Sequence, residues 1–197
     1  AARLALSSAV SNRTDLPETA ATDAATMEAL INSSETLAAF ADNFATEPTG
    51  AGPADTNWAL PVSGRVLRAF NEADAVGVRR PGWVLATEAG AIVTTPAPAT
   101  VRFAGDLPEF GTVVILEPQA GELLILAGAG DLFVTRGQIL AKDEPIGFMS
   151  GDFAREQEKL IETEQRGGQL GRETLYIELR QGRNAVDPGS RFVGQTD

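Results

Sequence analysis

A stretch near the end of the chain, residues 174–180, alternates strictly between apolar and polar side chains. The apolar positions are Leu175, Ile177 and Leu179, and the polar positions are Thr174, Tyr176, Glu178 and Arg180. Successive side chains of a strand point to opposite faces, so this pattern predicts a strand with one face in a core. The polar face combines a hydroxyl, a phenol, a carboxylate and a guanidinium. It is either an ordinary exposed strand surface or a binding surface.

From Trp58 onward, short apolar runs alternate with clusters of Gly, Pro, Asn and Asp, which predicts an all-β domain. The expected strands are residues 64–70, 82–87, 91–94, 100–104, 112–117, 122–126, 132–134, 139–141, 145–148 and 174–180. This spacing favours a strongly bent antiparallel sheet or a sandwich. Residues 153–165 are charged and helix-prone, and predict an inserted surface helix or loop.

The first 57 residues have a different character. They predict helices at residues 1–10, 24–31 and 34–44, followed by a linker rich in Gly and Pro. Helices this short are unstable alone in water, so each must pack on something. We therefore divide the chain into a helical segment with its linker, residues 1–57, and a β domain, residues 58–197.

Charge and missing residue types exclude several functions. The chain has 197 residues, a formal net charge of −11, no Cys and no His. The negative charge disfavours nucleic acid and anionic membranes as partners. The missing His and Cys exclude Ser-His-Asp and Cys-His nucleophile sites, disulfides, and zinc sites built on His or Cys. Carboxylate acid–base chemistry remains open.

Four stretches resemble, in the same order, segments of the LytM/lysostaphin-type zinc metallopeptidase domain. They are residues 60–66, 90–105, 110–117 and 175–188. The resemblance implies a mainly β fold with a helical N-terminal segment: a LytM-like (duplicated hybrid motif) antiparallel sheet domain preceded by short helices. Active members of this family bind zinc through the His and Asp of an HxGxD pattern and the last His of an HxH pattern. Two further histidines assist catalysis.

The resemblance also implies which residues occupy those five positions here. Arg80 and Val84 stand in the HxGxD pattern, Gly128 stands in the position of one assisting His, and Thr174 and Tyr176 stand in the HxH pattern. Arginine cannot be deprotonated to bind zinc, and valine has no donor atom. We therefore expect no zinc, no other cofactor and no peptidase activity.

Residues 175–180 further resemble the EnvC-type murein hydrolase activators, LytM proteins that have lost their metal ligands. The resemblance implies that the protein binds and activates periplasmic zinc-dependent N-acetylmuramoyl-L-alanine amidases, which split septal peptidoglycan during cell division. It also implies a periplasmic location and an upstream coiled coil that contacts an FtsEX-like complex. We expect residues 1–10 to be the end of that coiled coil.

In this interpretation the former catalytic groove docks the amidase. Tyr176 is the expected anchor, and Arg180 and Arg80 are expected to pair with carboxylates of the partner. Glu178 either holds one of these arginines or meets a cation of the partner. Thr174 and Gly128 are expected in the same groove. The alternative for Glu178 and Arg180 is simple pairing along the sheet.

The helix expected at residues 34–44 suggests regulation. Leu37, Phe40 and Phe44 fall on one helical face, and a groove that accepts a partner helix also accepts a helix of its own chain. We hypothesise that this helix covers the groove at rest and that movement upstream removes it. The alternative is that it packs on the back of the domain.

Two other functions stay open. A non-catalytic peptidoglycan-binding module would use the same groove for glycan or stem peptide. A carboxylate-based hydrolase would need two acids about 5–10 Å apart. The motif regions offer no clear second acid beside Glu178, which makes this alternative weak.

Overall fold

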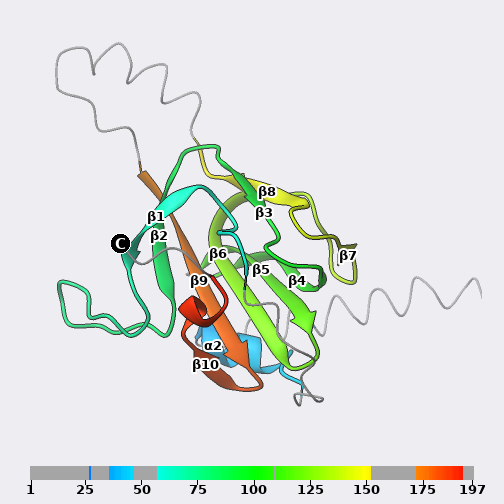
Figure 1. Cartoon of the computed structure of the whole chain (residues 1–197), viewed down its shortest axis with the longest axis horizontal. Coiled ribbons are helices and arrows are strands. Elements are labelled where there is room, and N and C mark those ends of the chain that lie inside the picture. Colours follow the sequence, from blue (N-terminus) through cyan, green and yellow to red (C-terminus); the bar gives the residue numbers. More distant parts are fainter. Residues whose placement is uncertain (1–26, 28–35, 47–56, 109, 152–171, 193–197) are drawn as a thin grey trace, which may run out of the picture. The chain divides into compact units, whose positions relative to one another are not determined.

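The computed structural model describes residues 27, 36–46, 57–108, 110–151 and 172–192 (Figure 1). The chain forms two compact units, Ala1–Asn43 and Phe44–Asp197. The second unit therefore begins before Trp58, where the sequence analysis placed the start of the β domain. None of the described helices is long and apolar enough to cross a membrane.

In the first unit, the described helix is α2 (Leu37–Asp42), which is shorter than the expected helix at residues 34–44. Thr36 caps its start, because its hydroxyl accepts from the Ala39 N–H at 3.0 Å. Asn43 caps its end. Leu37 and Phe40 lie on this helix as predicted, whereas Phe44 follows the cap and belongs to the second unit. The prediction of one helix through Phe44 is therefore wrong.

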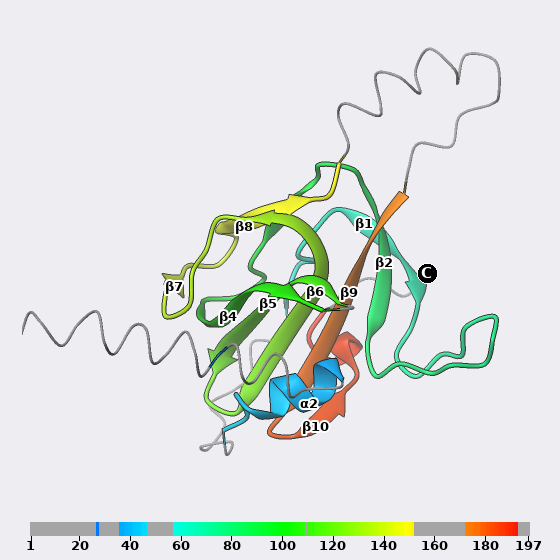
Figure 2. The same cartoon turned by 180° about the vertical axis from the view of Figure 1, so that it is seen from behind.

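The second unit is built from antiparallel strands followed by a short 3-10 helix. They are β1 (Gly64–Arg68), β2 (Trp83–Glu88), β3 (Ile92–Thr94), β4 (Ala99–Leu107), β5 (Gly111–Gln119), β6 (Glu122–Leu132), β7 (Ile139–Leu140), β8 (Pro145–Met149), β9 (Arg172–Gln181), β10 (Asn184–Val186) and η1 (Pro188–Ser190). The strand order is β1-β2-β9-β6-β5-β4-β7, with β10 beside β9 and β8 joining β3 to β6. Figure 2 shows from behind that β9 lies between β2 and β6.

The predicted fold class, a mainly β antiparallel domain, is confirmed. The separate strand expected at residues 132–134 is wrong, because Leu132 is the last residue of β6. The sequence analysis missed β10. The helices expected at residues 1–10 and 153–165 lie outside the described residues, as does the one at 24–31 except for Met27.

The core of the second unit lies on one face of the sheet. Leu175, Ile177 and Leu179 on β9 are fully buried there, as their alternation predicted. Large side chains from neighbouring elements complete this core: Leu85, Leu116, Leu124, Leu126, Leu140, Ile146 and Met149. Burial of these side chains supplies the main stabilisation of the sheet. It also commits the polar residues of β9 to the opposite face.

The two ends of the described sheet region are tied together. The Trp58 N–H donates to the Arg191 carbonyl at 3.0 Å, and the Trp58 ring meets Phe192 edge-on at 5.5 Å. Arg191 Nε lies 2.7 Å from Glu122 Oε1, and both side chains are buried. Removing one partner of a buried ion pair is strongly destabilising, because the other charge is then left buried and unpaired. These contacts join the segment at Trp58 to Arg191 and Phe192 and, through Glu122, to β6.

Candidate functional site

The polar side chains of β9 form one connected network. The Tyr176 hydroxyl donates to Glu178 Oε2 at 2.8 Å, and Arg180 Nη1 donates to Glu178 Oε1 at 2.7 Å. Arg180 Nη2 donates in turn to the Arg183 carbonyl at 2.6 Å. The Glu178 and Arg180 side chains are 2% and 5% exposed. We call the sheet face that carries Tyr176, Glu178 and Arg180 the site face.

Tyr176 is held in place from several sides. Its ring lies over Gly82, where an added Cβ would stand 2.7 Å from the phenol oxygen. Burial is the main cause that raises the pKa of Tyr176, and the neighbouring Glu178 carboxylate raises it further. Arg80 and Arg180 act in the opposite direction but do not outweigh these causes. The phenol therefore stays protonated and remains a donor to Glu178.

Cross-strand pairs show which other residues share the site face, because partners directly opposite each other in a sheet lie on the same face. Tyr176 pairs with Val84 on β2 and with Ala127 on β6. At Gly128, φ is +100°, and an added Cβ would stand 2.7 Å from the Thr174 carbonyl oxygen. The structure thus brings together all five positions that the resemblance implied.

Arg80 reaches this site from the loop between β1 and β2. Arg80 Nη1 lies 3.1 Å from Asp74 Oδ2, and the other Asp74 oxygen accepts the N–H groups of Val76 and Val78 at 3.0 and 2.8 Å. The pKa of Asp74 is lowered, chiefly by the hydrogen bond from Val78, with Arg80 and Arg68 contributing. Asp74 therefore orders the loop and positions Arg80, whose side chain is 48% exposed.

Arg65 and Arg68 also belong to the site face, and the sequence analysis missed both. Arg68 pairs with Val84, the partner of Tyr176, and Arg65 pairs with Ala86, the partner of Thr174. Residues three apart on a regular strand point to opposite faces. The register shifts between Val66 and Arg68, and this bulge turns both arginines to one side. A bulge has no reliable sequence signal here.

A row of paired residues runs across the site face from β9 to β4. Glu178 pairs with Ile125, Ile125 with Ile115, and Ile115 with Phe103. The Phe44 ring lies against the far end of this row, with its centroid 6.3 Å from that of Phe103. Phe44, one of the three residues predicted to be regulatory, thus lies on the site face beside β4, three strands away from Glu178.

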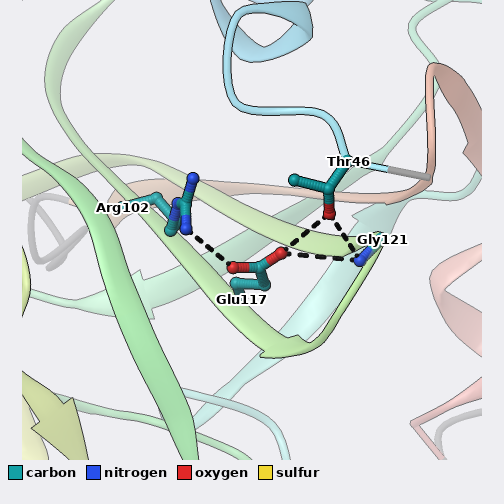
Figure 3. Close-up of polar contacts among 4 residues, drawn as sticks. All are labelled: Thr46, Arg102, Glu117 and Gly121. Carbon is teal, nitrogen blue, oxygen red and sulfur yellow. Dashed lines mark hydrogen bonds and ion pairs between the residues drawn. The ribbon is translucent and has the colours of Figure 1, made fainter. Parts of the chain in front are cut away.

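The chain just after Phe44 is held by a cluster that we call the Thr46 clasp: Thr46, Arg102, Glu117 and Gly121 (Figure 3). The Thr46 hydroxyl donates to Glu117 Oε1 at 3.1 Å and accepts the Gly121 N–H at 2.9 Å. Arg102 Nη1 lies 3.1 Å from Glu117 Oε2 and orients that carboxylate. The clasp therefore fixes residues 44–46 to the β5–β6 hairpin.

This sheet, with its site face on β2, β6 and β9, is a LytM-type domain. The chain belongs to peptidase family M23, whose family model matches residues 79–188, more than half of the chain. An uncharacterized protein of Haemophilus influenzae is 26% identical over 140 residues, which are 71% of this chain and 30% of that protein. The chain thus spans less than a third of this relative.

Solved structures share the fold. Csd3 of Helicobacter pylori has a TM-score of 0.53 and 17% identity, over 72% of this chain and 36% of that one. A zinc-containing peptidase of Vibrio cholerae has a TM-score of 0.51 and 18% identity, over 68% and 40%. A chain of the SpoIIQ–SpoIIIAH pore-forming complex has a TM-score of 0.53 and 19% identity, over 71% and 92%.

The family implies a zinc ion, and the residues at the corresponding positions do not fit one. Arg80 is a permanent cation, Val84 offers no donor atom, and Gly128 has neither a side chain nor room for one. Tyr176 keeps its proton, and its oxygen is committed to Glu178. Within the described residues there is also no group of three Asp, Glu, His or Cys side chains that could hold a metal.

Proposed function

We propose that this protein is a non-catalytic activator of periplasmic zinc-dependent N-acetylmuramoyl-L-alanine amidases, and that its site face docks the amidase. The observation that carries this proposal is that residues unable to bind zinc stand at the positions of the family's zinc ligands. In this chain of peptidase family M23, these positions carry the Arg80 cation and the Tyr176 phenol, which donates to Glu178, instead of a set of zinc ligands. Such a surface suits recognition better than hydrolysis.

The contacts divide the predicted docking residues into two roles. Tyr176 and Arg80 are the partner contacts, because the phenol is only partly buried and Arg80 is half-exposed. Glu178 and Arg180 are positioning residues, because both are buried and bonded to each other. They hold the Tyr176 ring in one orientation, which lowers the entropy cost of binding.

Regulation by the N-terminal arm is part of the same proposal. Leu37 and Phe40 of α2 lie directly before Phe44, which rests on the site face, and the Thr46 clasp anchors the chain that follows. The arm that carries α2 competes with the amidase for the site face in this proposal. Pulling on it from upstream, through a coiled coil and an FtsEX-like complex, would release the docking surface.

The proposed location is the periplasm. Membership of peptidase family M23 supports a location outside the cytoplasm. Peptidoglycan, the substrate of the amidase, is a further candidate ligand of the site face. A domain that only binds peptidoglycan is therefore the competing function, and the first experiment separates the two.

The first experiment measures release of dye-labelled sacculi by a purified periplasmic amidase, alone, with the full chain, and with residues 58–197. We expect no release by either form without amidase, and strong stimulation of the amidase by the fragment. The full chain should stimulate less. If neither form alters amidase activity while both sediment with sacculi, the protein is a wall-binding module.

Point variants test the docking surface. Tyr176→Ala and Arg80→Glu should each reduce stimulation of the amidase by about tenfold or more, the size typical of buried anchors and paired charges. Arg136→Glu is the matched control, because this exposed arginine lies in the turn before β7 at the other end of the strand order. Equal stimulation by all three variants would contradict docking at the site face.

The Thr46 clasp tests the arm. Thr46→Val keeps the side-chain shape but loses both hydroxyl hydrogen bonds, so the full chain should stimulate the amidase more strongly at rest. Thr112→Val is the control, because Thr112 loses a similar bond to Asp106 at 2.7 Å on the β4–β5 hairpin. An arm that only stabilises the fold would give no gain in either variant.

A further inference from the structure

We propose that the β1 edge of the site face is a docking surface for an acidic segment of the partner enzyme. We call it the arginine edge: Arg65, Arg68, Arg79 and Arg80. This inference rests on the proposed function, since it names the chemistry of the amidase surface that the site accepts. It extends the proposed docking site from Tyr176 and Arg80 to β1.

Cross-strand pairing places this edge on the same sheet face as Tyr176 and Thr174. Two rows of cross-strand partners connect the strands: Arg68 to Val84 to Tyr176, and Arg65 to Ala86 to Thr174. Arg65 and Arg68 are thus each two strands away from a residue of β9 on the same face. The bulge that brings both to this face is a structural feature that twists and redirects an edge strand.

The loop fixes the other two arginines. Arg80 is held by Asp74, and Arg79 Nη1 donates to the Asn71 carbonyl at 2.6 Å. The Asn71 N–H donates to the Arg80 carbonyl at 3.0 Å, which closes the base of the loop. These bonds lower the entropy that a partner must remove on binding. Arg79 and Arg80 are therefore preorganised cations, and not only charged side chains exposed to solvent.

Residues 64–83 have a net positive charge, whereas the whole chain has a net negative charge. Residues 64–83 carry these four arginines and two acids, Glu72 and Asp74, in a chain with a formal net charge of −11. Glu72 accepts the Ala69 N–H at 2.7 Å, and Asp74 is committed to the loop. Within the described residues, Arg65 and Arg68 have no ion-pair partner. A local cationic surface on an anionic protein selects and steers an acidic partner.

An alternative explanation is that arginines on an edge strand prevent it from pairing with the edge of another sheet. β1 is one of the two end strands of the described order, and β7 is the other. The two explanations differ in a measurable way. Edge protection predicts that removing the charges causes self-association, while a docking surface predicts weaker amidase binding that depends on salt.

The experiment compares three full-length proteins: wild type, the double variant Arg65→Glu/Arg68→Glu, and the control Arg136→Glu. Affinity for a purified periplasmic amidase is measured by biolayer interferometry at low and high salt, and stimulation is measured on labelled sacculi. We expect the double variant to bind about tenfold more weakly or worse at low salt. The wild type should lose affinity as salt rises, and the double variant should lose much less.

The milder pair Arg65→Gln/Arg68→Gln guards against misfolding, with thermal unfolding and gel filtration recorded for every variant. Its affinity should fall between the wild type and the charge reversal. If the wild type stimulates the amidase and the double variant binds as tightly as the Arg136→Glu control, the arginine edge is not a docking surface. If neither the wild type nor its residues 58–197 bind or stimulate the amidase, the proposed function itself fails.

Discussion

Because of Tyr176, the free energy of unfolding of the domain should fall at alkaline pH. The pKa of Tyr176 is raised in the folded protein by burial and by Glu178, while in the unfolded chain it titrates near its ordinary value of about 10. Below about pH 10 both states are protonated, so the contribution of the phenol is fully present. Above that pH the unfolded chain loses its proton first, and the free energy of unfolding falls.

Because the chain has one tyrosine, its tyrosinate absorbance reports this residue alone. We expect the folded protein to develop that absorbance at clearly higher pH than protein in denaturant. The Tyr176→Phe variant should lose less stability between about pH 9 and 11 than the wild type. A folded-state midpoint close to 10 would contradict this account of the site.

Gly82 is required because the Tyr176 ring lies over it. In Gly82→Ala the new methyl group would meet the ring at 2.7 Å and would also press on the Ile177 carbonyl oxygen. We expect a loss of about 1–3 kcal/mol in urea unfolding and reduced stimulation of the amidase. Gly105→Ala is the control, since its methyl would meet only the Phe103 ring, at 3.4 Å. Equal losses in both variants would argue against close packing at Gly82.

Two kinds of residue in this site differ in how they could be found. Alternation along one strand is enough to predict that Tyr176, Glu178 and Arg180 share a face. Gly82 and the Thr46–Glu117 contact depend on segments that are distant in sequence, and nothing local marks them. Glu178 holds Arg180, one of the roles expected for it, because alternate residues of a strand share a face.

At the scale of elements, the loop between β1 and β2 depends on Asp74. In Asp74→Asn, an amide oxygen still accepts the N–H groups of Val76 and Val78, but the charge that holds Arg80 is lost. We expect faster amide hydrogen exchange in residues 71–80 and weaker stimulation of the amidase. Asp106→Asn, on the β4–β5 hairpin, should change neither.

The Asp74 carboxylate also makes the order of the loop depend on acidic pH. The pKa of Asp74 is lowered on folding, so its contribution is present above its unfolded pKa of about 4 and is lost as pH falls through the lower folded value. The wild-type loop should therefore loosen in acid, as seen by hydrogen exchange or by NMR. The loop of the Asn variant should already be loose at neutral pH and change little.

β1 shows why an element can be predicted while its faces are not. The sequence analysis expected a strand from residue 64, and the structure has one at Gly64–Arg68. Simple alternation puts Arg65 and Arg68 on opposite faces, whereas the bulge puts them on the same face. The bulge arises from pairing with β2, so a strand examined alone cannot reveal it.

At the scale of the whole molecule, charge is distributed unevenly along the chain. Residues 14–57 contain no Lys or Arg, and their acidic residues are Asp15, Glu18, Asp23, Glu28, Glu35, Asp42, Glu47 and Asp55. The site face, in contrast, offers arginines. An acidic arm would compete with an acidic amidase segment for the same cations, and salt would weaken that competition.

This leads to a test of the arm as a whole. The ratio of amidase stimulation by residues 58–197 to stimulation by the full chain should be largest at low salt and should fall toward one as salt rises. Taking the ratio removes the effect of salt on the amidase and on docking. A ratio that stays constant with salt would mean that electrostatic attraction does not hold the arm.

The mainly β fold and the apolar and polar faces of β9 follow from local alternation, which needs no knowledge of neighbouring strands. Which residues stand at the positions of the family's zinc ligands follows only from the resemblance to that family. Tertiary structure alone decided the start of the second unit, the seat of Phe44 on the site face, the Thr46 clasp and the arginine edge. Each of these depends on contacts between segments far apart in the chain, and the arginine edge depends in addition on the register of β1 against β2.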